Sequence, residues 1–420
     1  MREKETSRHH VVGVGRVSLE VGVGLLFAIS IIADEIFPLF SETTGASFGR
    51  LLLPAMAFFL VANLRNFRPA PGLHYFTGWL AVCALSVLIV QVSSGSSYSL
   101  ADSYIISYAS SIIAFQFIYQ FIQTKQDFER FLYGYLASIV LGLVYMAVTG
   151  DLVYYEDRLR STLSNANGLG RMVGLAMLIT FFSSLKGHKW AIALTLFLFV
   201  MLLLTGSRGS LIATLAASLF MMIMGKKSVK KRSYNLIILV LLIGVGWQLF
   251  LQESGSFEHR YMKMMAIEDV IDTTHRSDIF MASLQMITDH PIWGVGVDQV
   301  KSLLFNNYGE NLPPIIYILM KKGELDTHNT FLFILAGTGI VGFVPFAWAL
   351  WEIGRFNYLS KKMKVHYADL SIAIFIFFIL ASLIGTLVTQ KLFWFGLGLS
   401  VIGSSIVDED RPTQRQDSGH

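Results

Sequence analysis

Four short polar motifs carry the side chains of this 420-residue chain that could do chemistry: RLRSTLSNANG at 158–168, TGSRGS at 205–210, THRSD at 274–278 and DTHN at 326–329. The first three contain arginine, whose planar fork binds phosphate oxygens through paired hydrogen bonds and never loses its charge. The fourth contains His328, and histidine, which titrates at about pH 6.5, can accept a proton at neutral pH. If the fold brings these motifs together, they predict a site for an anionic headgroup or a diphosphate, with a general base beside it.

Each motif also has an ordinary structural interpretation. Arg208, in a Gly-Ser turn, can extend along the surface to a lipid phosphate, and Arg276 can form a surface ion pair with a neighbouring aspartate. His328 can cap the helix that follows it, and the asparagines of the first motif can be turn formers. Arg158 and Arg160 can simply contact lipid headgroups. The prediction of a site therefore depends on these side chains lying on one face of the fold.

Other kinds of site do not fit the sequence. The spacing of His259, His275 and His290 matches no zinc motif. The chain has no G-x-S-x-G nucleophile elbow, no Walker loop and no dinucleotide-binding fingerprint. Its single cysteine, Cys83, lies in an apolar run and is expected to be a small buried residue. We therefore expect no metal and no cofactor.

The composition indicates that membrane-spanning elements position the motifs. Hydrophobic residues make up 54% of the chain and charged residues 15%, against about 25% charged in soluble domains. These values exclude a soluble multidomain enzyme, a disordered chain and a nucleic-acid binder with a basic surface. We predict an all-α polytopic membrane protein with about twelve transmembrane helices. The apolar segments lie at 17–33, 51–63, 75–92, 104–122, 131–148, 168–185, 190–205, 210–224, 236–251, 329–353, 370–388 and 392–407.

The distribution of lysine and arginine predicts the topology. With a cytoplasmic N-terminus, 21 of the 33 Lys and Arg residues fall on the cytoplasmic side, so both termini are expected there. The connection 252–327 has six basic and eleven acidic residues and a helical stretch at 277–288, which predict a long structured periplasmic loop. The predicted division is 1–251 for transmembrane helices 1–9, 252–327 for the loop, 328–407 for helices 10–12, and 408–420 for a disordered cytoplasmic tail.

Four stretches resemble the O-antigen ligase and O-antigen polymerase superfamily, which are bacterial inner-membrane glycosyltransferases. They are RSTLSNANGLG at 160–170, LLTGSRGSLIA at 203–213, HRSDIFMASLQMITDHPIWGVGVDQ at 275–299 and DTHNTFLFILAGTGIVGF at 326–343. The resemblance covers roughly residues 150–345, with the motifs in the family's order. One departure is Ala166 between Asn165 and Asn167, where a proline often occupies the middle position.

The resemblance implies an enzyme that moves a glycan from undecaprenyl diphosphate to an acceptor hydroxyl of a lipid A–core sugar on the periplasmic face. The transfer would be inverting and independent of metal and cofactor. By position, Arg208 and Arg276 would bind the diphosphate and His328 would be the catalytic base, while Arg160, Asn167 and Arg158 would make secondary substrate contacts. The implied partners are the lipid-linked glycan, the acceptor glycan or lipid A–core, membrane lipid and a polysaccharide chain-length regulator, without nucleic acid.

Other functions stay open at this point. An O-antigen or exopolysaccharide polymerase would use the same donor and chemistry but join lipid-linked repeat units; the motifs favour the ligase. A polysaccharide-lipid transporter also has twelve helices with both ends inside, but usually carries ionisable groups near the bilayer midplane and shows repeat symmetry. Here the segments are nearly free of charge apart from Glu20 and Arg171, and one half alone has the long loop. A non-catalytic scaffold leaves the arginines unexplained.

Overall fold

The apolar segments are helices wherever the structure describes them. The computed structural model describes residues 18–36, 48–94, 104–155, 158–161, 166–224, 276–308 and 326–406; the predicted segment at 236–251, the predicted tail and much of the predicted loop lie outside these ranges. Helix makes up 81% of the described chain, as the predicted class requires. The helices are α1 (Leu19–Ile36), α3 (Phe48–Leu51), α4 (Leu53–Ala62), η1 (Leu64–Asn66), α5 (Leu73–Ser94), α6 (Tyr104–Phe121), α7 (Lys125–Thr149), α8 (Ala166–Lys186), α9 (Lys189–Leu204), α10 (Arg208–Met224), α14 (Arg276–Asp289), α15 (Val300–Asn306), α17 (Thr330–Lys362), α18 (Ala368–Ser382) and α19 (Lys391–Ser405).

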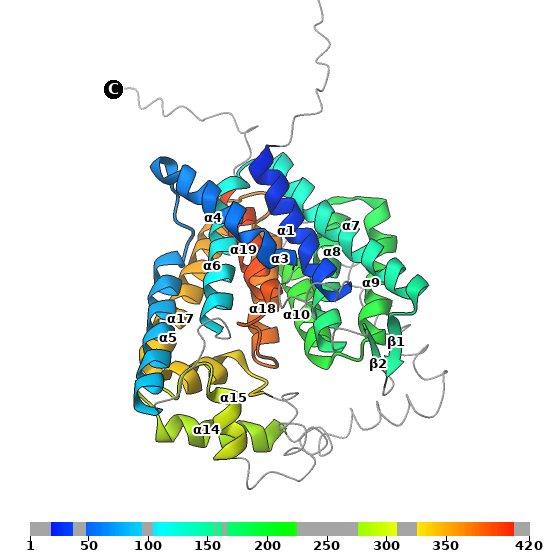
Figure 1. The fold of residues 1–420 in the computed structure, drawn as a ribbon. Coiled ribbons are helices and arrows are strands. Elements are labelled where there is room, and N and C mark those ends of the chain that lie inside the picture. Colours follow the sequence, from blue (N-terminus) through cyan, green and yellow to red (C-terminus); the bar gives the residue numbers. More distant parts are fainter. Residues whose placement is uncertain are drawn as a thin grey trace, which may run out of the picture.

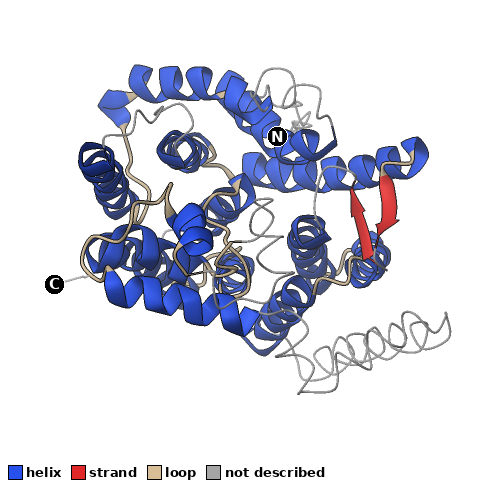
Figure 2. Cartoon of the chain, turned by 60° about the horizontal axis from the view of Figure 1, so that its bottom comes forward, coloured by secondary structure: helices blue, strands red, loops and turns tan. Residues whose placement is uncertain are grey.

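The helices form a bundle with two different ends. Helix α1 begins and α19 ends at one end, whereas α14, α15 and a β-hairpin lie at the other, here termed the α14 end (Figure 1). In Figure 2 the α14 end comes forward, and many helices are seen nearly end-on. Within the described ranges α7, α8 and α17 are long and apolar enough to cross a membrane, and shorter apolar helices pack beside them. The chain is therefore a multi-pass membrane protein.

Helix α17 consists of two helices joined by a kink at Gly339, where φ is 60° and ψ is −165°. The connection between α14 and α15 fills the break: the amide of Val295 donates to the carbonyl of Ala336, and the amide of Ile340 donates to that of Pro291, each at 2.9 Å. A Cβ on Gly339 would lie 2.1 Å from a carbonyl oxygen of this connection, so only glycine fits. Beyond the kink, α17 extends about 34 Å, enough to span the hydrocarbon core.

Aromatic side chains fix α17 and α19 against α5 and α6. The ring of Trp79 lies 4.8 Å from that of Tyr108, 5.1 Å from Phe346 and 6.2 Å from Trp394, measured between centroids. All four side chains are fully buried. The indole Nε1 of Trp394 donates to the carbonyl of Val388 at 2.8 Å. Because aromatic residues of this size bury about 150–250 Å² each, this cluster holds these helices in fixed positions.

Two differences from the predicted pattern occur at the α14 end. Strands β1 (Leu152–Tyr155) and β2 (Arg158–Ser161) pair antiparallel, whereas an all-α fold was predicted, and β2 contacts α8. Helix α18 ends at Ser382, whereas the apolar segment continues to residue 388. Hydropathy cannot detect this end, because the residues that follow include Leu, Ile and Val. We term residues 383–388 the α18 turn.

Candidate functional site at the start of three helices

Small residues bring the start of α8 against the start of α10. A Cβ on Gly170 would lie 2.7 Å from Cβ of Ser207 and 3.0 Å from Oγ1 of Thr205, an approach that only glycine permits. The hydroxyls of Ser207 and Ser210 are hydrogen-bonded at 2.8 Å within the same turn. The TGSRGS motif is therefore a tightly packed turn, and Arg208, which is half-buried, is the first residue of α10.

The α18 turn joins the start of α10 to the start of α17. On one side, a Cβ on Gly209 would lie 2.9 Å from Cγ2 of Ile384. On the other side, Nδ2 of Asn329 donates to the carbonyl of Leu383 at 3.2 Å. Two consecutive residues of one turn thus contact both helix starts. The second and fourth polar motifs are therefore brought together, although 116 positions separate Ser210, the end of one motif, from Asp326, the start of the other.

Side chains of its own first turn fix the start of α17. Asn329 is the N-cap: its Oδ1 accepts from the amides two and three positions further on, at 2.9 and 3.1 Å. The buried hydroxyl of Thr330 donates to the carbonyl of Gly385 and accepts from the amide of Leu387, both at 2.8 Å. These bonds attach the helix start to the α18 turn.

His328 lies directly before this cap, and Asp326 orients it. Its φ is 48°, in the left-handed region that non-glycine residues rarely adopt and that is common at functional sites. The backbone amide of His328 donates to Oδ1 of Asp326 at 2.9 Å, and the ring Nδ1 lies 3.4 Å from the same oxygen. A carboxylate on the Nδ1 side favours the tautomer with its proton on Nδ1, which makes Nε2 the basic nitrogen.

Arg171 is an arginine that the motif analysis did not place in the site. It lies in the second turn of α8, is 8% exposed, and its Nη1 would be 3.2 Å from a Cβ on Gly385 in the α18 turn. A charged arginine inside a membrane segment costs free energy and is usually functional. Arg171 interrupts an otherwise apolar run, so the sequence could have identified it as a candidate site residue on this ground.

The electrostatics of this region favour an anion. Helices α8, α10 and α17 all begin here, and a helix N-terminus carries about half a positive charge. Arg171 and Arg208 add full positive charges on two of these helices. Fixed positive groups of this kind can stabilise negative charge that develops on a leaving group. Within the described ranges, no three His, Cys, Asp or Glu side chains lie close enough together to hold a metal ion.

The remaining predicted site residues also lie at the α14 end. Asn167 is the second residue of α8, and Arg158 and Arg160 lie on β2, which contacts that helix. Arg276 is the first residue of α14 (Figure 1). The side chains of Arg158, Arg160 and Arg276, and all of Asn165, lie outside what the structure describes. The structure thus brings together Arg208, His328 and the start of α8, whereas the contacts of Arg276 stay a prediction.

Comparison with known proteins supports the resemblance seen in the motifs. Residues 193–347 match a protein family described as O-antigen ligase. The matched region extends from α9 into α17, and it includes Arg208, Arg276 and His328 but not β2 or α8. A search of curated proteins gives no match. The match covers more than a third of the chain, and over these residues the sequence is similar to the O-antigen ligase family.

Proposed function

We propose that the chain is an O-antigen ligase-like glycosyltransferase, which moves a glycan from undecaprenyl diphosphate to a hydroxyl of a lipid A–core sugar. The observation that carries the proposal is the α18 turn, which contacts both the helix that starts at Arg208 and the helix start that carries His328. This arrangement sets positive groups for a diphosphate beside a base for an acceptor hydroxyl.

The donor diphosphate binds at the starts of α8 and α10. Arg208 and Arg276 contact its oxygens, as the family resemblance implies, and Arg171 adds a buried positive charge behind the α18 turn. Arg158, Arg160 and Asn167 contact the donor from the hairpin and the start of α8. The lipid tail lies along the apolar helix surfaces, so the diphosphate stays at the membrane interface.

The reaction is a single displacement at the anomeric carbon. Nε2 of His328 takes the proton of the acceptor hydroxyl as its oxygen bonds to the anomeric carbon on the face opposite the leaving group, which inverts the configuration. The bond from that carbon to the diphosphate oxygen breaks, and its electron pair stays on undecaprenyl diphosphate. The arginines bind this oxygen more tightly as its charge grows, so they lower the barrier.

We place the site on the periplasmic face of the bacterial inner membrane. Lys125 at the start of α7, Lys186 at the end of α8, and Lys361 and Lys362 at the end of α17 all lie at the end of the bundle opposite the α14 end. Positively charged residues collect on the cytoplasmic side. This distribution supports cytoplasmic termini and a periplasmic location for His328.

Product analysis tests the proposal. The purified protein is reconstituted in liposomes with undecaprenyl-diphosphate-linked repeat units, with and without lipid A–core, and products are identified by mass spectrometry. We expect glycan on lipid A–core, formed about 10²–10³-fold more slowly by Arg208→Ala, since this is the typical effect of losing one such donor. Longer chains on undecaprenyl diphosphate without dependence on lipid A–core would instead identify a polymerase. No glycan transfer with either acceptor would contradict the proposal.

A further inference from the structure

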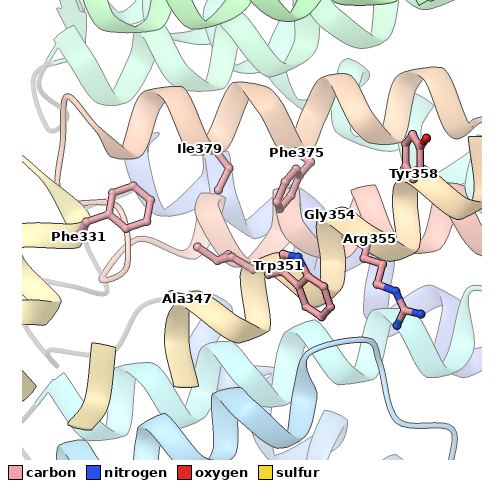
Figure 3. Close-up of a pocket in the computed structure, with 9 residues that line it drawn as sticks. Phe331, Ala347, Trp351, Gly354, Arg355, Tyr358, Phe375 and Ile379 are labelled. Carbon is pink, nitrogen blue, oxygen red and sulfur yellow. The ribbon is translucent and has the colours of Figure 1, made fainter. Parts of the chain in front are cut away.

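An open groove runs between α17 and α18, away from the candidate site. Its volume is about 570 Å³. Figure 3 shows Phe331 at the edge nearer the candidate site and Arg355 and Tyr358 at the opposite edge. Every lining residue other than Arg355 is uncharged, and most are aliphatic or aromatic. The groove is thus apolar, and Arg355 at one edge is the charged residue among those that line it.

The sequence of α17 shapes the groove. Ala347 and Gly354 are seven positions apart and therefore lie on one helix face, where their small size leaves space. A Cβ on Gly354 would lie 3.1 Å from the Phe375 ring of α18, so the two helices are close at this point. Trp351 and Tyr358, which are 55% and 52% exposed, form the outer wall. In a multi-pass membrane protein such an opening faces lipid.

The open end of the groove has an excess of positive charge. The guanidinium of Arg355 lies 5.7 Å from the ring of Trp351, and Nζ of Lys362 lies 4.9 Å from that of Tyr358. Of the nearby carboxylates, Asp369 pairs with Lys361, whereas Oε2 of Glu352 is buried 3.8 Å from a histidine nitrogen and has no hydrogen bond among the described residues. Among the described residues, neither Arg355 nor Lys362 forms a salt bridge with a carboxylate.

We propose that this groove is a binding site for an anionic phospholipid of the leaflet opposite the candidate site. The phosphate is bound by Arg355 and Lys362, and an acyl chain lies along α17 towards Ala347. The eight helical steps from Ala347 to Arg355 span about 12 Å, close to the depth of one leaflet, about 15 Å. Charge complementarity favours this occupant, because the uncharged tail of a polyprenyl lipid would make no use of the two cations.

Bound lipid would hold together the two helices on which the site is mounted. Helix α17 carries His328 at its start and α18 leads into the α18 turn. The site would therefore depend on the lipid composition of the other leaflet. This lipid site does not depend on the proposed glycosyl transfer, because it rests only on the groove and its charges.

Quenching of Trp351 by brominated lipid tests the proposal. Wild type and Trp351→Phe are reconstituted in phosphatidylcholine nanodiscs that contain a minor fraction of dibrominated phosphatidylglycerol or of dibrominated phosphatidylcholine. The difference between the two proteins isolates the fluorescence of Trp351 from that of the other tryptophans. We expect half-maximal quenching of Trp351 at a lower mole fraction of brominated phosphatidylglycerol than of brominated phosphatidylcholine. Each of the two basic residues should lower this mole fraction about fivefold.

Matched variants separate the site from general surface charge. Arg355→Gln should reduce the preference for phosphatidylglycerol about fivefold, and Arg355→Lys should retain it. Lys186→Gln is the control, since Lys186 lies at the same end of the bundle over the ring of Phe182, at 5.1 Å, outside the groove. Equal quenching by the two brominated lipids, an equal effect of Lys186→Gln, or relief of quenching by added undecaprenol, which has the polyprenyl tail without a phosphate, would each overturn the proposal.

Discussion

The contact between the starts of α8 and α10 gives the sharpest prediction, for Gly170→Ala. A methyl group at this position would lie 2.7 Å from Cβ of Ser207, whereas ordinary contacts begin at 3.4 Å, so the two helix starts must separate by about 0.7 Å. Neither atom is at the end of a flexible side chain, so the backbone itself must move. The displacement falls on Arg208, the residue that follows Ser207.

The expected effect is larger on rate than on stability. Overpacking costs about 1–3 kcal/mol, but alanine is favoured over glycine inside a helix by about 1 kcal/mol, so the net loss of unfolding free energy is about 2 kcal/mol or less. Misplacement of a catalytic group by about 1 Å can slow a reaction about 10²-fold. We therefore expect glycosyl transfer to fall about 100-fold, which is about 2.7 kcal/mol in the barrier.

The assay compares Gly170→Ala with Gly78→Ala in proteoliposomes supplied with lipid-linked glycan and acceptor. Gly78 is the matched control, because it lies inside α5 and a Cβ there would have no neighbour within 4 Å. Gly78→Ala should keep wild-type transfer, and both variants should reconstitute to the same level. Equal rates for the two variants would refute the claim that the spacing of α8 and α10 positions the site.

Three further predictions concern single side chains. Thr330→Val should lower the free energy of unfolding by about 2–4 kcal/mol, because it leaves the carbonyl and amide of the α18 turn unpaired; thermal unfolding beside Thr149→Val, whose hydroxyl is exposed, measures this. Burial, with the hydrogen bond from Tyr308 to Asp289, raises the pKa of the Tyr308 phenol to about 12. The neutral phenol therefore adds stability below about pH 10 that is lost as the pH rises through about 12, and ultraviolet titration against Tyr308→Phe should show this group titrating earlier after Asp289→Asn. Cys83 is the single cysteine and is fully buried, so it should react with a maleimide only after denaturation; rapid labelling of the native protein would contradict its place in α5.

Hydropathy predicted the helices well, because a segment in lipid must be a long apolar run whose backbone hydrogen bonds form within the segment, as they do in a helix. The predicted segment at 104–122 corresponds to α6, and the predicted helical stretch at 277–288 corresponds to α14. The kink at Gly339 was not predictable in this way, since it depends on hydrogen bonds from a segment more than forty positions earlier, such as Val295 to Ala336.

The candidate site was predictable in its charged residues but not in its framework. Arg208 and His328 stand out by residue type, and the structure connects their helices. The α18 turn connects these helices, but its apolar residues predict a continuation of the helix that precedes it. Asp326 was visible in the sequence only as part of a motif, because its contact with the ring of His328 depends on the backbone conformation at φ 48°.

The rate of a single transfer event in His328→Ala tests the central claim most directly. Transfer from lipid-linked donor to acceptor is measured in proteoliposomes by rapid quench, with enzyme in excess, beside His188→Ala, an exposed histidine at the opposite end of α9 from the site. The account predicts a rate about 10²–10⁴-fold lower for His328→Ala, as expected for loss of a general base, and an unchanged rate for His188→Ala. Wild-type transfer by His328→Ala would contradict the claim that the base stands at the start of α17.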